Sequence, residues 1–297
     1  VLLAPAGRPI YAADLAVAGL ARSERRLEDG TVERRWAARD VPRVRPEPGM
    51  PGWSEVAPFL HVSTYASWDD VARFYWGLVR EQVAPTPEVR EAALRIAAEV
   101  RRALGDRQVT DAARELALVQ AVHRFVVTNT RYVGLEFGIH GFKPYRVDQV
   151  LQRRFGDCKD KASLLRAMLE SIGIDARLVL LRMRRLGRLP EAPASLAVFN
   201  HAIVYVPALD LWLDGTAAYS GSGDLPGEDR GATVLVVNPD GRPRFATVPE
   251  ALPEQNRGET RFDVALAADG SAAVRGAWRV SGAEAPTYRR AYLVEEQ

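Results

Sequence analysis

The chain has 297 residues, 47% of them hydrophobic, and a formal net charge of +2 at pH 7. This length suits two or three domains, and the apolar content permits a sizeable globular core. The near-balanced charge argues against a dedicated nucleic-acid binder, no apolar run approaches the length of a membrane span, and a single cysteine excludes an intrachain disulfide framework and a cysteine-rich zinc site.

The first 65 residues are expected to be the end of a β-domain followed by a linker. Residues 27–31, with the sequence Leu-Glu-Asp-Gly-Thr, are typical of a hairpin turn between polar strands. Four prolines between Pro42 and Pro51 indicate a linker. The sequence starts at Val1 and shows no signal peptide.

Three helices are predicted next. The first runs from Ser67 to about Val83, and the second follows a Thr86-Pro87 cap and ends at Leu104 before Gly105. The third begins at Thr110, and its apolar positions recur at helical spacing: Leu116, Val119, Val122 and Val126.

The only cysteine lies in the run Gly156-Asp157-Cys158-Lys159-Asp160-Lys161, directly before a fourth helical pattern. The apolar positions of this pattern are Ala162, Leu165, Met168, Leu169 and Ile172. Asp157 can cap the helix, and Gly173 suits a left-handed end. A thiol in the first helical turn lies at the positive end of the helix dipole, which stabilises the nucleophilic thiolate.

Strands are predicted near residues 176–183, 200–206 and 211–214. His201 lies 43 residues after Cys158 (201 − 158), and Asp214 lies 13 residues after His201 (214 − 201). Thirteen residues suit two adjacent antiparallel strands joined by a turn at residues 207–210, which brings His201 and Asp214 roughly opposite one another.

Two further hairpins are predicted near the C-terminus. One joins residues 233–237 to 244–246 through a turn at 238–241, and the other joins 262–266 to 274–280 through Asp269-Gly270. Their period-two alternation predicts one buried face for each hairpin. We find no catalytic grouping in this part of the sequence, and the expected role is a β-module that supports the core or binds a partner.

Each of the three polar residues also has an ordinary structural interpretation. A lone cysteine is often a buried small hydrophobe, His201 can be a satisfied core residue, and Asp214 before Gly215 can be a turn residue. The charged neighbours of Cys158 argue against a core environment. The order and spacing of the three residues favour a thiol acyl-transfer site, because a thiol needs a base and an imidazole needs an orienting carboxylate.

The segments 131–136, 143–144, 155–162, 180–181, 199–202 and 213–216 carry a resemblance to a known family, and the Gly-Asp-Cys-Lys-Asp-Lys run is the most specific of them. Residues 132–216 resemble the transglutaminase-like core of the thiol-protease superfamily that also contains papain. The nearest resemblance is to a bacterial subfamily in which this core follows an N-terminal β-domain of unknown function.

The resemblance implies an α+β fold with helices packed on an antiparallel sheet, flanked by β-rich N- and C-terminal segments. It implies a domain division of 1–65, 66–220 and 221–297, and an exported or periplasmic location. It also implies that Cys158 is the nucleophile, His201 the base and Asp214 the orienting partner of His201.

The expected function is cysteine-dependent acyl transfer on amide bonds of a protein or peptide substrate. A peptidase, an amidase and a crosslinking transglutaminase would share this site. The alternatives are a catalytically silent scaffold with the same fold and a regulatory protein that works through its outer β-domains. For the oxyanion we expect the backbone N–H of Cys158 and the hydroxyl of Tyr132, with His140 as the other polar candidate. The mechanism needs no cofactor and no metal, and the four histidines show no metal-ligand spacing.

Overall fold

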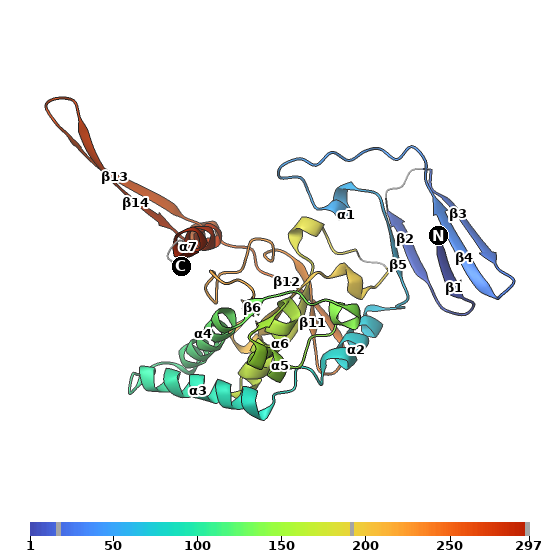
Figure 1. Cartoon of the computed structure of the whole chain (residues 1–297), viewed down its shortest axis with the longest axis horizontal. Coiled ribbons are helices and arrows are strands. Elements are labelled where there is room, and N and C mark those ends of the chain that lie inside the picture. The colour runs from blue at the N-terminus through green and yellow to red at the C-terminus, as the bar shows by residue number, and fades with distance from the viewer. Residues whose placement is uncertain (16–18, 191–192, 295–297) are drawn as a thin grey trace.

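The computed structural model describes residues 1–15, 19–190 and 193–294 (Figure 1). Its centre is a five-stranded antiparallel sheet in the order β10-β9-β8-β11-β12. The strands are β8 (Arg177–Leu181), β9 (His201–Val206), β10 (Leu211–Leu213), β11 (Thr233–Val237) and β12 (Pro243–Thr247). Helices pack on this antiparallel sheet, so the α+β class predicted from the sequence is confirmed.

The N-terminal region forms two small sheets. One has the order β1-β4-β3, from β1 (Leu2–Pro5), β3 (Ala21–Arg26) and β4 (Thr31–Ala37), and the other pairs β2 (Tyr11–Leu15) with β5 (Phe59–Ser63). The turn at residues 27–31 joins β3 to β4, as the sequence predicts. After the short helix α1 (Trp53–Val56), Ser63 at the end of β5 donates a hydrogen bond to the carbonyl of Ala194, which links this region to the core.

The helices begin at the predicted caps. Ser67, Thr86 and Thr110 accept hydrogen bonds at the starts of α2 (Trp68–Val79), α3 (Pro87–Leu104) and α4 (Asp111–Asn129). Helix α2 ends four residues before the predicted Val83. Residues 80–82 form a turn instead, and Pro85 disfavours a helical backbone at the residue before it. The carbonyl of Gln82 accepts a hydrogen bond from the N–H of Val147, the first residue of α5 (Val147–Arg153).

Both faces of the central sheet are buried. Helix α6 (Cys158–Ser171) lies against β8 and β9 on one face, where Leu178, Leu180, Ala202 and Val204 join the helices in the main core. On the other face, Val179, Leu181, Ile203 and Val236 pack with Leu225, Ala232 and Val248 from the segments that flank β11 and β12. The sheet is therefore covered by helices on one side and by the chain's own connections on the other.

The C-terminal region differs from the sequence expectation in two ways. Strands β11 and β12 belong to the central sheet, because β11 pairs with β8 across the expected boundary at residue 220. The second hairpin, β13 (Gly258–Leu266) and β14 (Ala272–Val280), projects from the core (Figure 1) and is exposed along nearly its whole length, so the prediction of one buried face is wrong for it. The reason is that, among the residues that the structure describes, its apolar side chains have no covering layer apart from a contact between Trp278 and Tyr288 of α7 (Ala285–Val294).

Within the described residues, no helix combines the length and the apolar character that crossing a membrane requires. Two very short strands, β6 (Arg131–Tyr132) and β7 (Phe155–Gly156), pair in parallel just before α6. This pairing brings the segment around Tyr132 beside the start of the cysteine helix.

Candidate active site

Local hydrogen bonds make Cys158 the first residue of α6. The carboxylate of Asp157 accepts a hydrogen bond from the N–H of Asp160, and the carboxylate of Asp160 accepts one from the N–H of Asp157, which is a capping box. Gly156 is required before this cap, because a Cβ at that position would lie 2.6 Å from the Cβ of Asp160. The helix ends at Ser171, and Gly173 follows with a φ of 84° that suits glycine.

The charged neighbours of Cys158 are buried, so the prediction that they mark an exposed, non-core environment is wrong. The physical reason is that each charge has a partner. Lys159 pairs with Asp157, the carboxylate of Asp160 accepts hydrogen bonds from Arg153 at 2.7 Å and from the N–H of Tyr145, and Lys161 donates to the carbonyl of Thr130. Burial raises the pKa of Asp160 and lowers the pKa of Lys161 to about 8.

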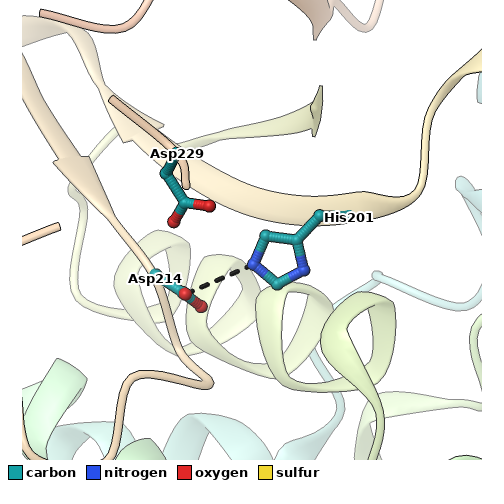
Figure 2. A group of neighbouring side chains, drawn as sticks. All are labelled: His201, Asp214 and Asp229. Carbon is teal, nitrogen blue, oxygen red and sulfur yellow. Dashed lines mark ion pairs between the residues drawn. The ribbon is translucent and has the colours of Figure 1, made fainter. Parts of the chain in front are cut away.

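The hairpin of β9 and β10 brings His201 and Asp214 together. Leu213 lies opposite Val204 in this hairpin. Asp214 is therefore diagonal to His201, the first residue of β9, and not directly opposite it. The Nε2 atom of His201 lies 3.2 Å from Oδ2 of Asp214 (Figure 2). This contact is close, but its angle is poor for a hydrogen bond. Both side chains are buried.

Asp214 is held in place by its own turn. The N–H and the hydroxyl of Thr216 donate to Oδ1 of Asp214 at 2.7 and 2.8 Å. Burial by itself favours the neutral carboxyl, but His201 and these donors outweigh it and lower the pKa of Asp214. Burial likewise opposes the charged imidazole, yet Asp214 and Cys158 raise the pKa of His201 well above its ordinary value. The arrangement therefore favours an imidazolium between two groups that can be anions.

Cys158 is half-buried and lines one cleft of about 220 Å³ together with His201, and interaction with Cys158 is one of the causes that raise the pKa of His201. Since Nε2 of His201 faces Asp214, the other ring nitrogen, Nδ1, is the atom left for the sulfur. The cleft wall combines apolar side chains with a few polar groups: Tyr75, Glu136, Phe142, Lys159, Leu196, Phe199 and Asn200. The structure thus brings Cys158, His201 and Asp214 together.

The two oxyanion candidates lie in different surroundings. Tyr132 is half-exposed in β6, and burial followed by the charge of Cys158 raises its pKa to about 12, so its hydroxyl stays protonated near the thiol. Tyr132 is not among the residues that line the cleft. His140 stacks on Tyr145 at 3.9 Å between ring centroids, and its Nδ1 contacts the carbonyl of Lys143. These contacts account for His140 without a role at the thiol.

Three polar residues near the site were not found from the sequence. Tyr75 of α2 lines the cleft, and burial followed by the charge of Cys158 raises its pKa. His123 of α4 places Nε2 2.9 Å from the backbone carbonyl of Asp214. Asp229, before β11, lies beside His201 and Asp214 (Figure 2). No local motif marks any of them, and Asp229 lies in the region where we expected no catalytic grouping.

A ligand atom from each of His201, Asp214 and Asp229 lies within 4.8 Å of the others, which is compact enough to test for a cation. However, Nε2 of His201 already faces Asp214, and Asp214 accepts two hydrogen bonds from Thr216. The raised pKa of His201 also favours its protonated form, which cannot bind a metal. The donor set therefore fits a proton-sharing group better than a metal centre.

Comparison with known proteins agrees with this fold. The sequence profile of the transglutaminase-like superfamily matches residues 102–206, so this part of the chain is a transglutaminase-like domain. The matched region contains Cys158 and His201 and ends before Asp214. No curated protein matches the chain.

Two solved structures are similar to the chain. A "putative protease" from Parabacteroides distasonis superposes with a TM-score of 0.61 at 18% identity over 91% of this chain and 50% of that one. The chain therefore spans about half the length of that protein, and the likeness is one of fold. A "putative cysteine protease" from Cytophaga hutchinsonii covers 90% of this chain and 78% of that one, at 11% identity with a TM-score of 0.29. This second score is too low to support any argument here.

Proposed function

We propose that this protein is a thiol enzyme that transfers acyl groups from amide bonds, with Cys158 as nucleophile, His201 as acid and base, and Asp214 as the residue that orients His201. The observation that carries the proposal is that a half-buried thiol and an imidazole line one cleft, and that Nε2 of this imidazole lies 3.2 Å from a buried carboxylate. A silent scaffold has no need of a histidine held in its protonated form beside a cysteine.

The reaction follows from these contacts. The thiolate of Cys158 attacks the amide carbonyl, and the carbonyl oxygen becomes an oxyanion. The imidazolium of His201 then gives its proton to the nitrogen, the C–N bond breaks, and an amine leaves a thioester on Cys158. Water or a second amine next loses a proton to His201 and attacks the thioester, which releases the acyl product and restores the thiol.

The oxyanion would be stabilised by two donors. The N–H of Cys158 belongs to the first turn of α6, where backbone N–H groups have no partner within the helix. The hydroxyl of Tyr132 is the second proposed donor, since β6 runs beside the start of α6 and the charge of Cys158 acts on this hydroxyl.

Alkylation of the thiol tests the proposal without knowledge of the substrate. At pH 6, iodoacetamide should modify Cys158 at least about tenfold faster than a cysteine peptide, because an ordinary thiol is almost wholly protonated there. His201→Ala should remove this advantage, and His140→Ala, a histidine away from the thiol, should keep it. Reaction no faster than the peptide, or only after denaturation, would identify a structural cysteine.

Intact-mass analysis of the products shows whether water or an amine accepts the acyl group. β-Casein incubated with the protein, with and without a primary amine, should show either new fragments or amine adducts in intact-mass analysis. Cys158→Ala should abolish both, since the chain has no other thiol. Fragments would define a peptidase, and amine adducts on glutamine would define a transglutaminase. Neither product, together with fast alkylation, would direct the search to small amides.

A further inference from the structure

Asp229 is a fully buried carboxyl group without a hydrogen-bond donor. Its side chain is 0% exposed, and neither carboxyl oxygen accepts a hydrogen bond from any residue that the structure describes. The backbone fixes its position, because the N–H of Asp229 donates to the carbonyl of Pro226 and the carbonyl of Asp229 accepts from the N–H of Ala232. The carboxyl group is therefore held in the interior by its turn and not by an ion pair.

The side chain faces the proposed catalytic pair. Figure 2 shows the carboxyl of Asp229 turned toward Asp214, above the imidazole of His201. An ionised Asp229 would place two carboxylates side by side, and a buried carboxylate without donors is costly. A neutral Asp229 removes both problems, because its O–H can donate to the carboxylate of Asp214.

The charges around Asp229 agree with a neutral carboxyl. Burial, followed by the negative charge of Asp214, raises the pKa of Asp229 to about 7, and Glu228 adds to the effect. The cation that faces Asp229 is His201, and its charge lowers the pKa of Asp229. On the far side of Asp214, Lys161 of α6 and His123 of α4 act on Asp214 itself.

We propose that Asp229 is a positioning residue whose neutral carboxyl donates a hydrogen bond to Asp214 and holds that carboxylate toward His201. The inference rests on the proposed function, since it assigns to Asp229 the support of the same thiol site. Asp214 would then be fixed from two sides: by Thr216 from its own turn and by Asp229 from the segment that leads into β11. The pairing resembles a carboxyl dyad that shares one proton.

Two substitutions separate this role from simple packing. Asp229→Asn keeps the size and a hydrogen-bond donor but cannot ionise, whereas Asp229→Ala removes the donor. The readout is the rate of Cys158 alkylation by iodoacetamide from pH 5 to 9, with circular dichroism to confirm folding. Asp240→Asn, in the exposed turn between β11 and β12, is the matched control.

We expect Asp229→Asn to react within about threefold of wild type at pH 6 and to lack the inflection near pH 7 that we expect in the wild-type profile. Asp229→Ala should react roughly tenfold more slowly, the cost of one hydrogen bond to a charged group. Wild-type profiles for both variants would overturn the proposal, as would a loss in Asp229→Asn as large as that in Asp229→Ala.

A second measurement does not depend on thiol reactivity. Carbon-13 NMR of carboxyl-labelled aspartate should show one carboxyl that titrates near pH 7 in wild type and is absent in Asp229→Asn. Slow alkylation of wild type with this signal present would reject the proposed function but keep the carboxyl pair. Absence of the signal, or a stoichiometric divalent cation that a chelator removes from wild type but not from Asp229→Asn, would overturn the inference itself.

Discussion

At the scale of single residues, Asp214 is held by contacts that do not involve His201. Two donors from Thr216 hold its carboxylate, and His123 contacts its backbone carbonyl. The orientation of Asp214 therefore does not depend on His201, and the carboxylate is positioned before the imidazole meets it. Such preorganisation is what an orienting carboxylate requires.

Asp214→Asn should reduce turnover by roughly 10- to 10⁴-fold, because the imidazolium loses its negative partner while the nucleophile and the base remain. The fold should survive, since the amide fills the same buried space. Asp210→Asn is a suitable control: Asp210 lies in the β9–β10 hairpin with a φ of 45°, a conformation that asparagine tolerates. Until a substrate is known, the alkylation rate is the measure, and equal rates for Asp214→Asn and wild type from pH 5 to 9 would favour the scaffold alternative.

Asp229 should also give stability an unusual pH dependence. Its pKa is about 7 in the folded protein against an ordinary value of 3.8, so between these values the folded state binds the proton more tightly than the unfolded state. The contribution to stability is therefore greatest below about pH 4 and is lost as the pH rises to about 7. In urea unfolding at pH 4.5, 6 and 8, the free energy of unfolding of Asp229→Asn should increase relative to that of wild type by about a few kcal/mol as the pH rises. Parallel stability curves for the two proteins would contradict this.

A site residue can be predicted from the sequence when the features that position it lie close to it along the chain. Cys158 could be predicted because its cap, its helix and its dipole lie within a few residues of it. Asp214 could be inferred because one hairpin separates it from His201. Asp229 could not, because its only relation to Asp214 is spatial and arises from the way β11 enters the sheet.

At the scale of elements, β11 and β13 show that one sequence pattern can serve two environments. Both carry apolar residues typical of strands, and the sequence predicted a hairpin for each. Strand β11 is buried on both faces because the helices and the connections cover it, whereas β13 has no such cover. Helix limits were easier to predict, because caps such as Thr86 and Gly105 act within the chain segment itself.

A matched pair of substitutions measures how much the burial of β11 and the exposure of β13 matter for stability. Val234→Ala on β11 removes two methyl groups from a fully buried side chain and should lower the free energy of unfolding by about 1–3 kcal/mol. Val264→Ala on β13, which is 61% exposed, should change it by less than about 0.5 kcal/mol. Chemical denaturation of both variants is the measurement. A comparable loss in Val264→Ala would show that the hairpin is covered in solution.

At the scale of the whole molecule, the N-terminal sheets and the cleft are built from separate parts of the chain. Every residue that lines the cleft lies at or after Tyr75, and residues 38–52, between β4 and α1 in the N-terminal region, lack regular structure. The boundary near residue 65 stays a prediction, and the sequence could not show that the core sheet continues to residue 247. Strand order depends on packing between distant segments, which no local pattern encodes.

Limited trypsin digestion should therefore cut first after Arg43, which is exposed in the segment without regular structure. The nicked protein should alkylate Cys158 at the rate of the intact chain. Mass analysis over time identifies the sites, and iodoacetamide kinetics on the nicked sample tests the site. First cuts within α3 or α6, or a loss of thiol reactivity on nicking at Arg43, would show that the two regions depend on one another.

The place of β11 in the sheet has a consequence for biosynthesis. Strand β8 is completed on one edge by β9 and on the other by β11, whose residues are translated after Asp214. A nascent chain that has just released Asp214 from the ribosome carries Cys158 and His201 but leaves one edge of β8 open and lacks Asp229. Because the sheet closes only when residues 233–247 emerge, the proposed site around Cys158 is completed after those residues have left the ribosome.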